Sequence, residues 1–118
     1  MVTIEQIAEA ALDGDSLQLR SLTQDLLREH PILTDYPKPH TNDSRLLAAA
    51  ASLVELLALR VRQTPPQWTK DVGALAEPIH LLKSAASMKR LRALCETEAP
   101  EPLRKRGFYA PPNFLEFA

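Results

Sequence analysis

The chain has 118 residues, of which 45% are hydrophobic and 25% charged, a composition typical of one soluble globular domain spanning residues 1–118. Its 14 basic and 15 acidic residues give a net charge of −1, so it lacks the positive excess typical of nucleic-acid-binding proteins. No apolar run reaches the roughly 20 residues that a membrane helix needs, and residues 1–6 lack the features of a secretory signal. With only one cysteine, these features predict a cytoplasmic protein with no membrane partner.

The residue types favour helices over strands. Glycine occurs only 3 times and aromatic residues make up 5% of the chain, whereas leucine and alanine are frequent. We therefore predict an all-α fold, a compact domain of about four to six helices with a central Leu/Ala-rich helix and an ordered C-terminal segment rich in proline and aromatic residues.

The segment 1–30 is predicted to form a helical hairpin. Thr3 and Gln6 have the spacing of a capping box at the start of a helix over about 4–12, and Gly14 ends that helix. The second helix extends to about His30 and is capped by Asp15 or Ser16. Three prolines then make the following segment, 31–42, an extended loop.

The strongest helical pattern in the chain predicts a central helix over 43–63, because leucines, valines and alanines recur there at helical spacing. Further apolar residues make this helix apolar nearly all round. Such a helix is either packed on several sides within its own domain or buried in a partner, and a homodimer through it is compatible with the pattern.

Less regular helices are expected over 77–106. Pro78 suits the first position of a short helix over about 78–85, and Ser87 is the expected cap of a helix to about Thr97. One further turn over 103–106 is expected to stop at Gly107.

The aromatic tail, 107–118, contains four of the six aromatic residues. Its apolar side chains either dock onto the helical core or stay available as anchors for another protein. Docking is preferred, because a large exposed apolar patch would make a free monomer prone to aggregate.

Neither the cysteine nor the histidines predict reactive chemistry. Cys95 shares an apolar helical stripe with Met88 and Leu91, so we interpret it as an inert core residue. His30, His40 and His80 lack metal-ligand spacing. We predict no catalytic residue, cofactor or metal site and no enzymatic activity; a site assembled from Glu77, His80, Lys83 and Arg106 is a third alternative that no spacing favours.

Opposite charges gather in the two halves of the chain. Residues 1–60 contain nine acidic and five basic residues, which argues against a DNA-binding helix-turn-helix in the hairpin. Residues 61–118 contain nine basic and six acidic residues, with a basic patch over 83–106 that includes Lys83. This patch could bind RNA, fit an acidic partner surface, or be a solvated face paired locally with Glu96, Glu98 and Glu101.

The C-terminal third carries a resemblance to a known group of proteins. Residues 91–107 (LRALCETEAPEPLRKRG) and 110–115 (APPNFL) resemble a small uncharacterised bacterial protein family. Its members are encoded beside nucleotidyltransferase-fold genes of the toxin–antitoxin type. The resemblance implies a two-protein module and supplies no catalytic residue.

The combined prediction is a non-enzymatic protein-interaction module, one component of a two-gene system of the toxin–antitoxin type, with a nucleotidyltransferase-fold protein as the implied partner. The alternative is an RNA-binding protein that uses the basic patch at 83–106. The candidate interaction residues are Lys89, Arg90, Arg92, Arg104, Lys105, Arg106, Phe108, Tyr109, Phe114 and Phe117.

Overall fold

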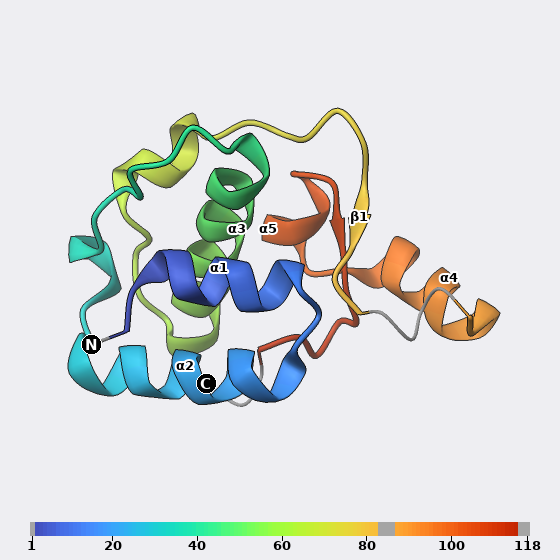
Figure 1. The fold of residues 1–118 in the computed structure, drawn as a ribbon, viewed down its shortest axis with the longest axis horizontal. Helices are drawn as coiled ribbons and strands as arrows, with labels where there is room; N and C mark the ends of the chain where they lie inside the picture. The colour runs from blue at the N-terminus through green and yellow to red at the C-terminus, as the bar shows by residue number, and fades with distance from the viewer. Residues whose placement is uncertain (1, 83–86, 116–118) are drawn as a thin grey trace.

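The computed structural model describes residues 2–82 and 87–115, and within these ranges it is a mostly helical fold with one short parallel ribbon (Figure 1). The predicted all-α class is therefore confirmed. The described elements are α1 (Ile4–Leu12), α2 (Ser16–Glu29), the 3₁₀ helix η1 (Leu33–Asp35), α3 (Ser44–Val61), the 3₁₀ helix η2 (Gln67–Asp71), β1 (Ile79–His80), α4 (Lys89–Glu98), α5 (Glu101–Arg104) and β2 (Phe108–Tyr109).

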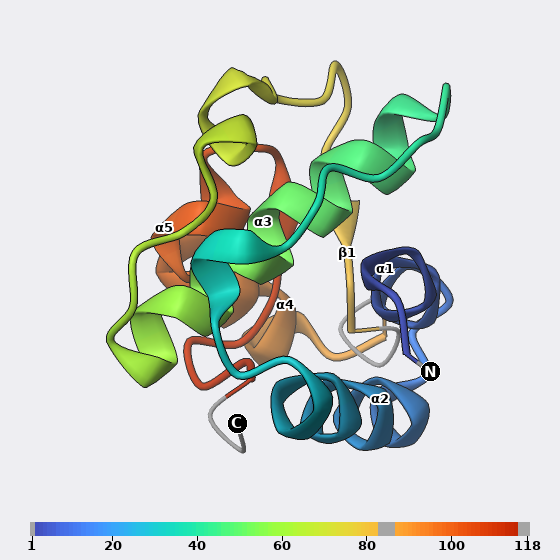
Figure 2. The same ribbon diagram turned by 90° about the vertical axis from the view of Figure 1, so that its left-hand side faces the viewer.

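The N-terminal hairpin forms as predicted from its local signals. Thr3 Oγ1 accepts a hydrogen bond from the backbone N–H of Gln6 at 3.3 Å, and the Gln6 side chain accepts one from the backbone N–H of Thr3 at 2.9 Å. Gly14 adopts a positive φ of 72°, and the side chain of Asp15 caps α2. The two helices run antiparallel in Figure 1, and in Figure 2, where α1 is seen nearly end-on, α2 lies below it.

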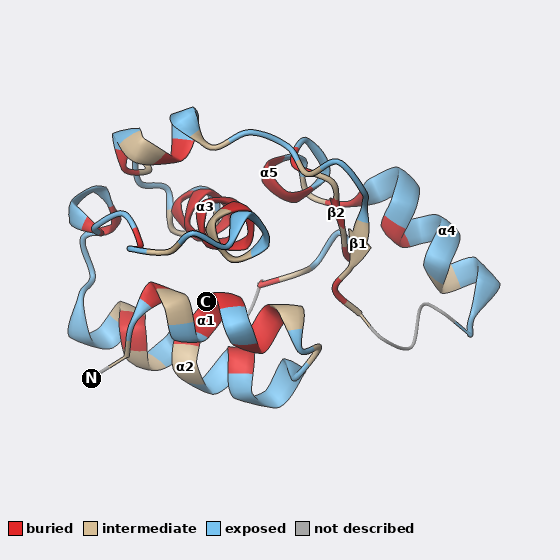
Figure 3. Cartoon of the chain, turned by 45° about the horizontal axis from the view of Figure 1, so that its top comes forward, coloured by how far each residue is buried: buried red, intermediate tan, exposed pale blue. Residues whose placement is uncertain are grey.

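The central helix α3 is packed on several sides by its own chain. Its buried residues run without interruption from Ala48 to Ala58, and α1, α5 and η2 all pack against it (Figure 3). A homodimer through this apolar helix would therefore have to open the core. Of the two alternatives that its sequence left open, burial within the domain is the one that the structure shows.

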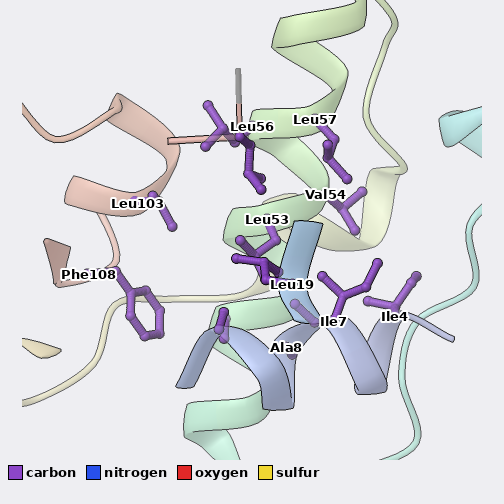
Figure 4. Close-up of a cluster of buried hydrophobic side chains, with 14 of the residues drawn as sticks. Ile4, Ile7, Ala8, Leu19, Leu53, Val54, Leu56, Leu57, Leu103 and Phe108 are labelled. Carbon is purple, nitrogen blue, oxygen red and sulfur yellow. The ribbon is translucent and has the colours of Figure 1, made fainter. Parts of the chain in front are cut away.

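The core is built where the hairpin meets α3 and the C-terminal segment (Figure 4). Its members are mostly aliphatic side chains, together with the ring of Phe108, and they are almost inaccessible to solvent. Their burial supplies the main favourable term in folding. The labelled core residues are Ile4, Ile7, Ala8, Leu19, Leu53, Val54, Leu56, Leu57, Leu103 and Phe108.

The prediction of a helix over 78–85 is wrong for residues 78–82, which the structure describes. Ile79 and His80 instead form β1, which pairs in parallel with β2 in the register Ile79 to Phe108 and His80 to Tyr109. The backbone N–H of Ile79 donates to the Gly107 carbonyl at 2.8 Å, and that of Leu81 donates to the Tyr109 carbonyl at 2.9 Å. These non-local bonds satisfy backbone groups that a local helix would otherwise pair. Residues 83–85 of the predicted helix lie outside the described ranges.

Two further boundaries differ from their predictions. The N-cap of α4 is Met88 rather than Ser87, and its side chain makes no capping hydrogen bond. The last turn is α5, which starts two residues earlier than expected. Gly107 follows it with a φ of 91°, a conformation that favours glycine, as predicted.

The described part of the aromatic tail docks onto the domain, as preferred from the sequence. Phe108, Ala110 and Leu115 are buried in the core. The guanidinium of Arg60 also donates hydrogen bonds to the carbonyls of Pro112 at 2.9 Å and Phe114 at 3.0 Å. Backbone and side-chain contacts therefore hold this segment against α3.

Arg106 is buried, which corrects its interpretation as a surface cation. Its side chain is 3% exposed, and its Nη1 lies 2.6 Å from Glu55 Oε1 on α3. The same guanidinium donates to the carbonyls of Thr69 at 2.7 Å, Val72 at 3.2 Å and Pro102 at 3.2 Å. Arg106 is turned inward because Glu55 and three carbonyls form a buried set of acceptors that its planar guanidinium can satisfy together.

Replacing Arg106 with leucine should destabilise the fold strongly, because it removes the buried partner of Glu55, leaves the exposed Lys105 as the cation beside that carboxylate, and takes hydrogen bonds from three carbonyls. We expect Arg106→Leu to lower the free energy of unfolding by about 3–5 kcal/mol in urea titrations. The matched control Arg104→Leu, an exposed arginine two residues away, should cost less than about 1 kcal/mol. Equal losses in the two variants would contradict the structural role of Arg106.

The stability of the fold should also depend on the ionisation of Glu55. Burial opposes ionisation, but hydrogen bonds from Arg106 and Lys105 outweigh it and hold the pKa of Glu55 below its ordinary value. A lowered native pKa contributes stability that is present above the unfolded pKa of about 4.3 and is lost as the pH falls through the native value. Between about pH 6 and pH 3, wild type should therefore lose unfolding free energy more steeply than Glu55→Gln. Parallel pH profiles would contradict this.

Candidate functional site

The element most accessible for contact is α4, which lies at the edge of the molecule, away from α1, α2 and α3 (Figures 1 and 3). Within this helix only Cys95 is buried and Leu91 is half-buried. The other eight side chains are exposed. No other described helix packs extensively along α4, so most of its surface faces solvent.

Three contacts hold α4 against the rest of the domain. Cys95 is fully buried, and Arg104 Nη1 donates to the Thr97 carbonyl near the end of the helix at 3.2 Å. On the other side, His80 Nε2 of β1 lies 3.2 Å from Glu96 Oε1. Among the described residues, these three contacts all involve the C-terminal half of the helix, at Cys95, Glu96 and Thr97.

The carboxylate of Glu96 is shared between two neighbours. Arg92 Nε donates to Glu96 Oε1 at 3.2 Å, and the His80 ring reaches the same oxygen. The Arg92 hydrogen bond, with a smaller contribution from His80, lowers the pKa of Glu96. The His80 ring also packs against Tyr109, with ring centroids 5.1 Å apart. His80 is thus a linking residue between β1, β2 and α4, and it lies in a strand rather than in the helix predicted over 78–85.

The thiol of Cys95 faces the interior. Burial raises its pKa, and the neighbouring Glu96 carboxylate raises it further. A thiol with a raised pKa is largely protonated at neutral pH and is a poor nucleophile. Its position agrees with the core interpretation of its helical spacing.

The basic patch predicted over 83–106 is divided by the fold. Three of the predicted cations lie together on one element, α4, and are exposed there: Lys89, Arg90 and Arg92. Arg104 is exposed but bonded to the end of α4, and Lys105 Nζ lies 3.0 Å from Glu55. Arg106 is buried, as described above, and Lys83 lies outside the described ranges.

The predicted aromatic anchors are mostly engaged by the domain. Phe108 is buried and is therefore not an external anchor, which corrects that part of the prediction. Tyr109 is half-buried against His80, and Phe114 is half-buried against the core. Phe117 lies outside the described residues.

The structure does not bring together the described residues that were considered for a scattered enzymatic site, and Lys83 lies outside the described ranges. Arg106 is bonded to Glu55 inside the domain, whereas His80 is bonded to Glu96 beside α4. Glu77 is exposed in the segment before β1. Among the residues that the structure describes, no cluster of three or more His, Cys, Asp or Glu side chains could hold a metal ion, and no helix is long and apolar enough to cross a membrane.

A second feature, which the sequence did not reveal, is a cavity of about 440 Å³ where the start of α1 meets the end of α2 and the following loop. Its walls are mainly apolar and include Val2, Ile4 and Leu26, with Glu29 and Asp35 among its polar residues. Glu29 Oε1 accepts the backbone N–H of Val2 at 3.1 Å. The hydroxyl of Tyr36 donates to the His30 carbonyl, and burial raises the pKa of Tyr36 to about 12. The cavity can hold an apolar group, and the Glu29 carboxylate and the Tyr36 hydroxyl in its wall are already bonded within the chain.

Glu55, the partner of Arg106, is a further residue that was not singled out from the sequence. It is the one charged residue between Leu46 and Leu59. A lone carboxylate on an apolar helix face needs a buried cation, so this exception to the pattern is the signal that could have located the ion pair with Arg106.

Comparisons with protein-family models, with characterised proteins and with solved structures find no match for this chain. The candidate site therefore rests on its own geometry.

The burial of Cys95 can be tested with a thiol reagent. Native protein should react with a disulfide such as 5,5′-dithiobis(2-nitrobenzoate) roughly a hundredfold more slowly than the unfolded chain, because the thiol must first become exposed. The unfolded chain, in denaturant, should release one equivalent of thiolate per chain. A rapid reaction of native protein would contradict the buried placement and reopen a nucleophilic role.

Proposed function

We propose that this chain is a non-enzymatic protein-interaction module and that α4 is the element that contacts its partner. The observation that carries this proposal is the contrast between α4 and the rest of the domain. Side chains of α1, α3, α5 and β2 are buried in the core, whereas α4 exposes Lys89, Arg90 and Arg92 together with Leu94, and Met88 is exposed at its N-cap.

The apolar residues beside these cations support a protein partner. Met88 is 54% exposed and Leu94 is 37% exposed, both next to the basic positions of α4. Protein interfaces combine apolar contacts at the centre with polar groups at the rim. The partner surface that fits α4 therefore presents acidic groups around a small apolar site.

The placement of the possible reactive groups supports a role without catalysis. The Cys95 thiol is buried with a raised pKa, and His80 is engaged by Glu96 and Tyr109. Arg106 is part of the core. None of these three side chains is arranged as a nucleophile with an adjacent base.

The resemblance of residues 91–107 and 110–115 to the bacterial family described above leads us to propose the class of partner. By that resemblance, the chain is one component of a two-gene module of the toxin–antitoxin type, and its partner is the nucleotidyltransferase-fold protein encoded beside it. Most of α4 lies inside the first of these two segments.

RNA binding is the rival function, and two placements make it the weaker one. Of the six predicted cations from Lys89 onward, only Lys89, Arg90 and Arg92 share a single exposed element. Phe108, one of the candidate aromatic interaction residues, is buried and cannot stack on a base. RNA recognition needs exposed aromatic faces beside its cations.

Co-expression with the product of the neighbouring gene tests the proposal. The two proteins should copurify and elute as one complex in size-exclusion chromatography. Lys89→Glu combined with Arg90→Glu should weaken that complex at least about tenfold, since it places like charges against an acidic surface. The control Lys38→Glu with Lys70→Glu changes two exposed lysines elsewhere and should leave the complex intact.

A wild-type chain that never copurifies with that product would overturn the proposed partner. A salt titration separates the rival function, because affinity for RNA that falls steeply with ionic strength would replace a protein partner by RNA.

A further inference from the structure

The charges of α4 are arranged against its own helix dipole. Lys89, Arg90 and Arg92 lie in its N-terminal half, whereas Glu96 and Glu98 lie in its C-terminal half. A helix N-terminus carries partial positive charge and its C-terminus partial negative charge. The cations and the carboxylates of α4 therefore each lie near the end whose partial charge has the same sign as their own. The first turn also lacks an acidic residue and a side-chain cap. Arg104 compensates the C-terminal end through the Thr97 carbonyl, whereas the first turn of α4 contains no acidic side chain to compensate its cations.

The outward face of α4 follows from its spacing. Arg90, Leu94 and Thr97 recur at i, i+4 and i+7, are all exposed, and lie away from the buried Cys95. Glu98 is exposed beside Thr97. The face thus runs from a cation through a leucine to a carboxylate over one short helix.

The order of charges along this face makes one copy of α4 complementary to a second copy that runs in the opposite direction. Two copies of α4 placed antiparallel about a two-fold axis at Leu94 bring Arg90 of each copy opposite Glu98 of the other. The two helix dipoles then oppose each other, and each basic N-terminal half gains an acidic neighbour. Such a contact uses the same patch on both copies, so the assembly closes at two chains.

We propose that the outward face of α4 docks onto a second copy of this chain as an antiparallel, two-fold symmetric pair. The inference rests on the proposed function, because it uses the same interaction helix and names an occupant for it. Self-association and binding of an unlike partner through α4 are then mutually exclusive, so the dimer masks the helix until the partner displaces it.

A second copy fits this face better than a uniformly charged ligand. RNA phosphates would be attracted to Arg90 but repelled by Glu96 and Glu98 on the same helix. A partner surface with the reversed order of charge meets both halves favourably, and the chain itself carries that surface. Among the described residues, neither Arg90 nor Glu98 has an ion-pair partner within its own chain.

Charge reversal tests the pairing by sedimentation velocity over a range of protein concentrations. Wild type should show a monomer–dimer equilibrium that weakens with added salt. Arg90→Glu alone and Glu98→Arg alone should each raise the dimer dissociation constant at least about tenfold, because each places like charges opposite one another. The double variant Arg90→Glu/Glu98→Arg should return it to within about threefold of wild type, because the pair is restored with its signs exchanged.

The control Lys38→Glu alters an exposed lysine in the loop before α3 and should leave the dimer unchanged. A chain that stays monomeric at every concentration, or a dimer that Arg90→Glu leaves unaffected, would overturn the inference. So would a double variant as weak as the single ones. Rescue by the double variant is specific to self-pairing, since an acidic partner of another kind would reject Arg90→Glu whether or not residue 98 is changed.

A cross-link provides a second readout that does not depend on charge. Leu94→Cys places a thiol at the proposed two-fold axis and should give a disulfide-linked dimer under mild oxidation. Leu17→Cys, at an 80% exposed position of α2, is the matched control and should stay mostly monomeric. Equal cross-linking of the two variants would also overturn the pairing. A monomeric chain that still copurifies with the neighbouring gene product would refute the dimer and leave the proposed function standing.

Discussion

The buried ion pair between Glu55 and Arg106 connects parts of the fold that are far apart in the sequence. Glu55 lies in the middle of α3, while Arg106 follows α5 and also bonds the carbonyls of Thr69 and Val72 around η2. With Arg106 fixed in this way, Gly107 turns the chain so that β2 pairs with β1 and Phe108 enters the core. A buried charge that loses its partner is costly in free energy, so the ion pair holds α3, the segment around η2 and the chain after α5 together. The same pair removes Arg106 from the surface and leaves α4 as the exposed cationic element.

Elements with strong local signals could be predicted from the sequence. The capping box at Thr3, the positive φ at Gly14 and the cap at Asp15 are each set by residues within a few positions of one another. The long apolar pattern likewise located α3 to within about two residues at each end. Burial of Cys95 followed from helical spacing, because its helix formed and Leu91 and Cys95 of the predicted stripe face the domain. Met88, the third member of that stripe, is instead exposed at the N-cap.

Features that depend on distant residues could not be predicted in this way. Pro78 is compatible with a first helical turn. The backbone N–H of Ile79, however, donates to the carbonyl of Gly107, and this pairing places Ile79 in a strand. Six cations close together in the sequence indicated one patch. In the structure, however, Arg104 bonds the end of α4, whereas Lys105 and Arg106 both contact Glu55 on α3. The cavity beside α1 also combines three separate segments. A charged side chain can therefore be buried in the core, bonded between two elements or exposed on the surface. Its tertiary contacts decide which of these it is.

The central claim is that the domain forms a cooperative core around α3, while α4 is a weakly anchored element available for contact. Native-state hydrogen exchange, at a concentration where the chain is monomeric, tests this most directly. The account predicts that amides in the middle of α3 exchange only through global unfolding, whereas those in the N-terminal half of α4 exchange through local opening, roughly a hundredfold faster or more. Protection of α4 equal to that of α3 would contradict it, because α4 would then be part of the core.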